Sequence, residues 1–362
     1  MRKNEAKWIE VRQRWQINIQ HDGERRTFIS STPGKKGKIE AERKADKWIE
    51  SKTKKDVRFS VLWDMFLVEV KATTSASNYK KHEQMGRLWL LPELKHKRLS
   101  TITSQDLQSI INKAHKKKLS KKTMMNIRAS ITAVCKYAAK DKRPFERPFG
   151  LEIPKDAPVR PKNIIQPSGL KTLFSINYIK RYNKQEPCFF IHAWRFMVLT
   201  GLRRGELCGL KNEDIKEGIV YIKRSVNYLR EETRGKNENA RRYFALSERA
   251  KTEIDAQVVM LKSRGVISPW VFPDESGHRL DPRHLFNKWF TYSHQHNIGC
   301  TLHEMRHTLV SVAKSDVPEQ LLKRIVGHSK TMDTYGIYGH DVDGDIQRAA
   351  KILDKTFDNL LK

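Results

Sequence analysis

The fold is decided by residues 301–340, which begin TLHEMRHT and end IVGHSKTMDTYGIYGH. Thr301 and Glu304 form a capping box, which predicts that a helix starts at Thr301. His303 and Arg306 are three residues apart, so they share one face of its first two turns. Free backbone N–H groups and the helix dipole favour an anion there. We therefore expect a phosphate site, at which a nearby tyrosine can form a covalent intermediate.

A second informative stretch lies upstream, where residues 200–210 read TGLRRGELCGL. The apolar run 196–199 before it predicts a buried helix, and the Thr-Gly pair at 200–201 ends that helix. Arg203 and Glu206 follow at helical spacing. The carboxylate can therefore pair with the guanidinium and orient it.

Together these segments resemble the catalytic domain of the tyrosine recombinases, the phage integrase family. In that family one box is an arginine within TGLRxxE, and a second consists of HxxR, then GH, then Tyr-x-His. All these positions occur here in the same order, over roughly residues 163–345. The resemblance implies DNA cleavage through a 3′-phosphotyrosyl intermediate, without metal, cofactor or ATP. The implied catalytic residues are Arg203, Lys236, His303, Arg306, His328 and Tyr338 (the nucleophile), supported by Glu206 and His340.

Two of the implied residues have competitors close by. Tyr338 lies ten residues after His328 and fits the Tyr-x-His ending, whereas Tyr335 lies seven after it, which is too close for the family pattern. Lys236 lies before an Arg-x-apolar-x-Leu pattern, on a predicted β-hairpin. Arg234 is the alternative if the register of that hairpin slips by two residues.

Other interpretations of the same residues are weaker. His303, Glu304 and His307 also spell HExxH, the zinc-peptidase signature. No clear third ligand follows, and a capping role for Glu304 makes the match a coincidence of spacing. Arg203 alone would be an ordinary ion-paired arginine and Tyr338 alone a half-buried core tyrosine. Their joint appearance with two histidines and a second arginine favours the recombinase interpretation.

The composition favours a nucleic-acid partner. The chain has 362 residues, 71 Lys and Arg against 41 Asp and Glu, a net charge of +30 and a pI of about 10.0. This length suggests two or three domains, and the excess charge is spread along the whole chain. Such a charge suits a polyanion, with an anionic membrane surface as the weaker alternative.

The chain also suggests a cytoplasmic location, in a bacterial host and near its nucleoid. No apolar run approaches the ~18 residues that span a bilayer, so we expect no membrane partner. The start, MRKNEAKW, lacks the apolar segment of a secretory signal. The four cysteines are far apart without a CxxC, which predicts reduced thiols. They are Cys135, Cys188, Cys208 and Cys300.

Residues 1–55 predict a small module of three strands and one helix. Apolar residues at 15, 17 and 19 alternate with polar ones, which is typical of a half-buried strand. Asp22-Gly23 is a hairpin turn signal. A glycine-containing basic loop is expected around residues 35–38, followed by a helix over 39–51.

This module resembles the arm-type DNA-binding domain of many mobile-element integrases. Strands of this kind can enter a major groove. The alternative is a basic, solvated hairpin without a specific site. The DNA contacts implied by the resemblance are Arg25, Arg26, Lys35 and Lys36.

Residues 56–143 predict a helical domain that resembles the family's core-binding domain. An apolar stripe over 59–70 marks one helix, and the proline-containing run 88–94 predicts a helix end and a turn. Thr103 or Ser104 caps the next helix.

Ser120 caps one more helix in this block, and lysines gather at the junction before it. A lysine run is usually a solvated surface, but in a helical DNA clamp it would contact phosphates. The expected contacts are Lys116, Lys117, Lys118, Lys121 and Lys122.

The remaining chain predicts three further parts. Residues 144–163 are proline-rich and aperiodic, as in an extended linker, and a hinge there would let two domains close around a duplex. Residues 164–345 form the expected catalytic domain, in which strands at 219–222 and 242–246 pair. The tail, 346–362, is amphipathic; in the family it packs on a neighbouring protomer, and the alternative is docking on its own domain.

We therefore expect an α+β, multidomain protein that acts as the integrase of a phage or another integrative element. The resemblance implies double-stranded DNA with core and arm sites as the substrate. It also implies a homotetramer on DNA that recombines through a Holliday junction, with an excisionase and a host DNA-bending protein as further partners. The alternatives are an enzyme resembling the type IB topoisomerases, which act alone, and a DNA-binding accessory protein that has lost catalysis.

Overall fold

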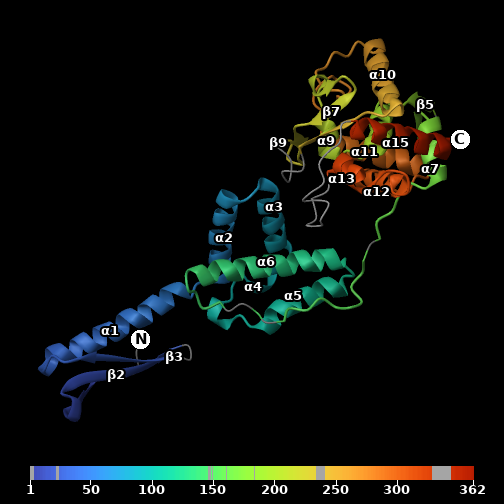
Figure 1. Ribbon diagram of the computed structural model, residues 1–362. Helices are drawn as coiled ribbons and strands as arrows, with labels where there is room; N and C mark the ends of the chain where they lie inside the picture. The colour runs from blue at the N-terminus through green and yellow to red at the C-terminus, as the bar shows by residue number, and fades with distance from the viewer. Residues whose placement is uncertain are drawn as a thin grey trace. The chain divides into compact units, whose positions relative to one another are not determined.

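The computed structural model describes residues 4–21, 24–145, 148, 150–159, 161–182, 184–233, 241–327 and 344–362. The chain divides into two compact units, Met1–Arg160 and Pro161–Lys362 (Figure 1). The first unit contains two separate hydrophobic cores, one in the N-terminal module and one in a helical domain. The fold is α+β and multidomain, as expected.

A three-stranded antiparallel sheet of order β1-β2-β3 and one long helix form the N-terminal module. The elements are β1 (Lys7–Ile9), η1 (Glu10–Arg12), β2 (Arg14–His21), β3 (Glu24–Ser30) and α1 (Gly34–Lys55). Strand β2 buries Ile17 and Ile19 against Ala41 and Ala45 of α1. The alternating pattern thus gives the inward face of the sheet.

The basic loop expected at residues 35–38 is instead the first turn of α1, which begins at Gly34. The glycines were interpreted as loop signals, but Gly37 meets a packing requirement. A Cβ atom there would lie 1.7 Å from the carbonyl oxygen of Thr32 and 2.7 Å from the Trp15 ring. The missing side chain lets the helix lie directly on the sheet.

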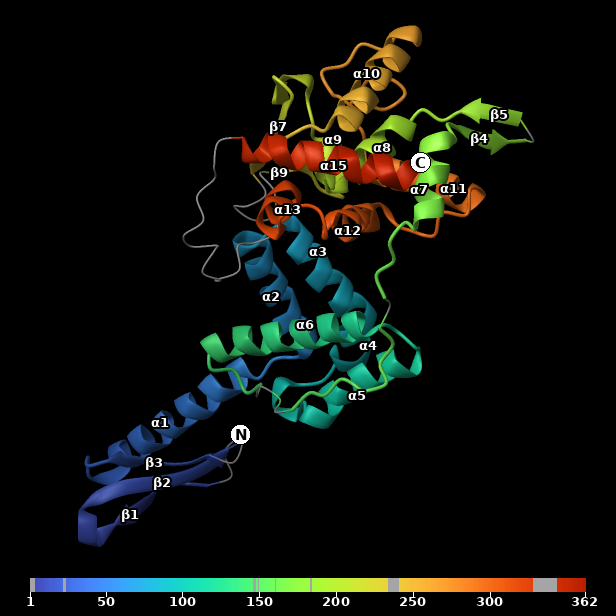
Figure 2. The same cartoon turned by 45° about the vertical axis from the view of Figure 1, so that its right-hand side comes forward.

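The helical domain is built from short helices around one core. They are α2 (Phe59–Thr73), α3 (Ala76–Met85), η2 (Gly86–Leu90), α4 (Leu91–Leu94), η3 (Leu99–Thr101), α5 (Ser104–Lys116) and α6 (Lys121–Lys140). Helix α6 crosses the α2–α3 pair (Figures 1 and 2). Thr103, rather than Ser104, is the N-cap of α5, and Ser120 caps α6, accepting a hydrogen bond from the Thr123 N–H.

The turn expected within residues 88–94 is absent from the structure. Here η2 is a single π-helical segment, and α4 continues directly from it. Pro92 lies in the first turn of α4, where a backbone N–H has no intrahelical acceptor. The proline is therefore tolerated without ending the helix.

The proline-rich segment after α6 has no helix or strand over its described residues, yet much of it is packed. Phe145 and Ala157 are buried in the helical core, and the carbonyl of Pro158 accepts a hydrogen bond from the Lys121 N–H. The expected linker 144–163 is therefore largely part of the helical domain's surface. The division between the two units follows Arg160.

The second unit surrounds a buried central helix with helices and a small sheet of order β10-β7-β6. Its elements are α7 (Pro167–Ser175), β4 (Tyr178–Arg181), β5 (Lys184–Pro187), α8 (Ile191–Thr200), α9 (Arg204–Cys208), η4 (Asn212–Asp214), β6 (Ile215–Lys216), β7 (Ile219–Ile222), β8 (Ser225–Val226), β9 (Glu232–Thr233), β10 (Arg242–Ala245), α10 (Glu248–Ser263), α11 (Pro282–Gln295), α12 (Leu302–Ala313), α13 (Glu319–Val326) and α15 (Asp345–Leu361). Every residue of α8 except His192 is buried.

Helix α15 docks on its own domain (Figure 2). Leu353 and Phe357 are buried in the core of the second unit. The carboxylate of Asp354 accepts hydrogen bonds from the N–H groups of Glu248 and Arg249, at 2.7 and 3.0 Å, where α10 begins. Throughout the described part of the chain, no helix is long and apolar enough to cross a membrane.

Candidate active site

Arg203 is placed by two tight backbone features. Gly201 ends α8 in a left-handed conformation, with φ of +64°. Arg203 then becomes the N-cap of α9. Helix α9 lies directly against β8, because a Cβ atom at Gly205 would be only 2.4 Å from the carbonyl oxygen of Val226.

Glu206 binds Arg203 twice, as its spacing predicted. One carboxylate oxygen accepts from the backbone N–H of Arg203 at 2.9 Å and the other from its Nη1 at 2.7 Å. Arg203 also donates through Nη2 to the carbonyl of Gly327, 3.0 Å away, at the end of α13. The guanidinium is thus held in one orientation while 36% of the side chain stays exposed.

Arg242 is a member of this cluster that our sequence analysis missed as a site residue. From β10 it donates to both oxygens of Glu206, at 3.0 and 2.9 Å, and through Nε to the carbonyl of Ile325 at 2.7 Å. The signal was present in the alternation of the strand, since Arg242 shares its inward face with the buried Phe244.

Glu206 remains ionised despite its burial. Burial alone raises its pKa, but the hydrogen bond and charge of Arg242, together with Arg203, outweigh that effect and hold the pKa below its usual value. One carboxylate therefore serves two guanidinium groups.

Arg306 adds a third cation and has no carboxylate partner among the described residues. Its side chain is buried, with the residue only 2% exposed, and Nη1 donates to the carbonyl of Gly201 at 3.0 Å. Within the described chain Nη2 is buried without a hydrogen-bond partner. Burial, followed by the charges of Arg203 and Arg242, lowers the pKa of Arg306 to about 9. A buried guanidinium with an unused donor favours an anionic ligand.

His303 lies one turn before Arg306 on α12, and its side chain is exposed. Its ring contacts His307 edge to face, with centroids 5.1 Å apart. Partial loss of hydration lowers the pKa of His303, and the neighbouring His307 and Arg306 lower it further. A neutral imidazole at this position can accept a proton. His307 is a second residue that we had considered only as a zinc ligand.

Glu304 is a helix cap. Its Oε2 accepts from the N–H of Thr301 at 2.6 Å, which confirms the predicted capping box, and its Oε1 accepts from the N–H of Asn163 at 2.9 Å. Both oxygens are thus engaged by backbone, which is unlike the general base of a peptidase. Nor does the described part of the chain contain three or more His, Cys, Asp or Glu side chains grouped to hold a metal.

Several predicted site residues lie outside the described residues. They are Lys236 and its alternative Arg234, and His328, Tyr335, Tyr338 and His340. The structure does place Gly327, the residue directly before His328. It is the left-handed C-cap of α13, and Arg203 binds its carbonyl. The chain thus leaves the arginine cluster at the point where the second predicted segment begins.

The predicted DNA contacts are exposed basic side chains on two parts of the first unit. Arg25 and Arg26 lie on β3 and the lysines at 35 and 36 on the first turn of α1. The others surround the junction of α5 and α6; they are Lys116, Lys117, Lys118, Lys121 and Lys122.

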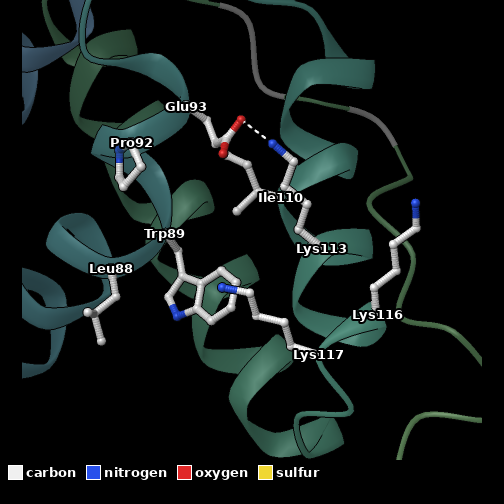
Figure 3. Close-up of a pocket in the computed structure, with 8 residues that line it drawn as sticks. All are labelled: Leu88, Trp89, Pro92, Glu93, Ile110, Lys113, Lys116 and Lys117. Atoms are coloured by element: carbon white, nitrogen blue, oxygen red, sulfur yellow. Dashed lines mark hydrogen bonds and ion pairs between the residues drawn. The ribbon is translucent and has the colours of Figure 1, made fainter.

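Near that junction a pocket of about 320 Å³ lies between η2–α4 and α5 (Figure 3). Lys117 covers its aromatic wall, with Nζ 5.4 Å from the Trp89 ring centre. Lys113 pairs with Glu93 at 2.5 Å, whereas Lys116 extends away from that pair (Figure 3). The lysines of this junction therefore differ in how free they are.

Comparison with known proteins agrees with this arrangement. The model of the phage integrase family matches residues 176–344, and that of the phage integrase N-terminal SAM-like domain matches residues 58–115. The curated tyrosine recombinase XerC of Bacillus licheniformis is 22% identical over 285 residues, which cover 73% of this chain and 87% of XerC. The chain therefore belongs to the phage integrase family of tyrosine recombinases.

Solved structures share the fold. The integrase of the transposon Tn1549, bound to transposon right end DNA, superposes with a TM-score of 0.61 at 20% identity, covering 79% of this chain and 97% of that one. A lambda integrase tetramer bound to a Holliday junction gives a TM-score of 0.64 at 12% identity, covering 91% of this chain and 96% of that one.

Proposed function

We propose that this protein is a site-specific DNA recombinase that cleaves and rejoins DNA through a 3′-phosphotyrosyl intermediate. The observation that carries the proposal is the charge of the buried cluster. Arg203, Arg242 and Arg306 converge on the single carboxylate of Glu206, and a donor of Arg306 is left without a partner. A phosphate diester supplies the anion that this cluster lacks.

In the reaction we propose, the arginines stabilise the transition state. Attack on a phosphodiester places charge on the non-bridging oxygens of a five-coordinate phosphorus. Arg203 and Arg306 donate to those oxygens from fixed positions, assisted by His328. Arg242 touches Glu206 rather than the substrate, so it is a positioning residue for Arg203.

The proton transfers are assigned to groups at either side of the phosphorus. Tyr338 attacks as its hydroxyl proton passes to His303, which is neutral before the reaction. The departing 5′-oxygen receives a proton from Lys236, and His340 supports the site. The phosphotyrosyl ester retains the energy of the broken bond, so a 5′-hydroxyl can reverse the step without ATP. A histidine acceptor and cationic donors supply these steps from the protein's own side chains.

We further propose that the biological reaction is integration and excision of a phage or another mobile element in the bacterial cytoplasm. Two rounds of strand exchange within a homotetramer would proceed through a Holliday junction, and the lambda integrase structure is described as such a tetramer bound to a Holliday junction. The helical domain would bind the core site and residues 1–55 an arm site. An excisionase and a host DNA-bending protein complete the proposed assembly.

A covalent selection tests the activity without knowledge of the attachment site. The full-length protein is incubated with duplexes that carry a randomised core and a nick, so that cleavage releases a short fragment and traps the protein. We expect complexes that survive denaturing detergent and whose DNA converges on one inverted-repeat sequence, because two protomers share a site.

The alternatives predict other results in the same selection. A topoisomerase-like enzyme would trap duplexes without a common inverted repeat. A silent accessory protein would retain DNA before detergent treatment and release all of it afterwards. Either outcome would reject the recombinase proposal.

A further inference from the structure

The segment that leads from the first unit into the second is fixed to the helix that carries His303 and Arg306. The N–H of Asn163 donates to Glu304 Oε1 and the N–H of Ile165 donates to Thr308 Oγ1, both at 2.9 Å. Ile165 is 3% exposed and belongs to the core of the second unit. Because residues 304 and 308 are one turn apart, the segment runs along α12 rather than away from it.

Lys162 is brought to the active site by this attachment. It directly precedes Asn163, so its side chain starts beside the first turn of α12, where His303 lies. The residue is exposed, and no acidic side chain of the described chain pairs with it. The nearest candidate, Glu304, uses its two oxygens for the N–H groups of Thr301 and Asn163.

An independent sign of this proximity comes from the histidines. The positive charge of Lys162 contributes to the lowered pKa of His307, where it ranks after burial. It also contributes to the lowered pKa of His303, after burial, His307 and Arg306. The lysine is therefore near both rings, on the exposed side of a cluster that already has excess positive charge.

A fourth cation beside this cluster is unfavourable unless an anion separates the charges. The buried arginines can hold one phosphate. Lys162 is exposed and approaches from the N-terminal end of α12, so it suits a neighbouring phosphate on the same strand. Backbone N–H groups at a helix N-terminus favour the same ligand.

We propose that Lys162 binds the DNA phosphate next to the one held by Arg203 and Arg306, which makes the end of the inter-unit segment part of the active site. This inference rests on the proposed function, because it requires DNA at the arginine cluster. It adds a DNA-binding residue to which our sequence analysis had assigned no role.

Salt dependence of binding tests the contact. A duplex recovered from the covalent selection is titrated with the full-length Tyr338→Phe protein, with and without Lys162→Ala. Losing one phosphate contact should make the slope of log K against log salt shallower by about 0.9 and weaken binding ~3–10-fold near physiological salt. Lys162→Arg should keep the slope. Lys171→Ala, which removes an exposed lysine of α7, should leave it unchanged.

The pH dependence of cleavage tests where the contact lies. The rate at subsaturating DNA reports groups of the free enzyme. His303 is faced by His307 and Arg306 on its own helix, by Lys162 and by Arg203. Removing the Lys162 charge should raise the pKa of His303, so the acid-side midpoint of the rate profile should move to higher pH in Lys162→Ala. In Lys162→Arg it should stay in place.

The possible outcomes are decisive. A shallower slope together with a shifted midpoint supports the proposal. An unchanged slope, or a slope that falls equally in Lys171→Ala, overturns it, and so does a shallower slope with a fixed midpoint, which would place the contact away from His303. Failure of the proposed function is a separate result, because the wild-type protein would then trap no DNA.

Discussion

Arg242 and Glu206 form a two-point ion pair, at 3.0 and 2.9 Å, in which the side chains are only 5% and 3% exposed. Removing one partner leaves the other charge buried and poorly paired, which costs far more than the pair itself contributes. This relationship explains why an arginine that does not reach the substrate is part of the site.

Arg242→Met should therefore destabilise the protein by roughly 3–5 kcal/mol. Urea unfolding measures the difference, with Arg241→Met as the matched control at the exposed neighbouring residue, where a change within about ±0.5 kcal/mol is expected. Adding Glu206→Gln to Arg242→Met should recover part of the loss, because the uncompensated charge disappears. Equal stability of Arg242→Met and wild type would show that the pair is not important for the fold.

Stability should also depend on Glu206 at acid pH. Its pKa in the folded protein lies below the ordinary value of 4.5. The unfolded chain then binds the proton more readily, so this contribution is complete above about pH 4.5 and is lost as pH falls through the lower folded value. The stability difference between wild type and Glu206→Gln should shrink over that window. A difference that stays constant from pH 6 to 3 would contradict the ionised state of Glu206.

The nucleophile can be identified with the trapped complex. Tyr338→Phe should abolish covalent trapping on a nicked core duplex, because the attacking hydroxyl is gone, whereas Tyr335→Phe should retain it. Denaturing gel electrophoresis of labelled DNA measures both. The reverse pattern would move the assignment to Tyr335.

The general acid is tested with sulfur in the 5′-bridging position. An alkoxide leaves poorly without a proton, so Lys236→Ala should cleave ordinary DNA ~10²–10⁴-fold more slowly. A thiolate leaves readily because a thiol has a pKa of about 8.5, so the same variant should cleave the sulfur substrate at nearly the wild-type rate. Arg203→Ala should not be rescued, because it removes charge stabilisation. Rescue of Arg234→Ala instead of Lys236→Ala would place the hairpin register two residues away.

Chelation separates the cap from the zinc-peptidase interpretation. Cleavage should survive EDTA, and Glu304→Ala should lower stability by on the order of 1 kcal/mol, as for a lost helix cap. Metal analysis of the purified protein is the control. Stoichiometric zinc together with chelator-sensitive cleavage would defeat the recombinase assignment.

The parts of the fold that depend on local chemistry were predictable from the sequence. The capping box at Thr301 starts α12, and the Arg203–Glu206 spacing places both groups at the first turn of α9. Period-two alternation identified β2, and a Thr-Gly pair ended α8. In each case the decisive contacts lie within a few residues of one another.

What the sequence left open depends on contacts between distant residues. Glu206 and Arg242 are 36 positions apart, and their pairing requires the strand to be placed beside α9. Asn163 reaches Glu304 across 141 positions. Gly37 and Pro92 resemble loop signals until the surrounding packing is known, because a glycine that permits close approach has the same local appearance as one in a turn.

The glycines at 201 and 205 have a consequence for recognising inactive relatives in genomes. Both are required by the backbone: one by a left-handed φ, the other by the carbonyl of Val226. A gene whose product has lost strand cleavage but still folds and binds DNA would retain both letters of the TGLRRGEL signature. Annotation of active enzymes should therefore weigh Arg203 and Arg306, and give the glycines credit only for the fold.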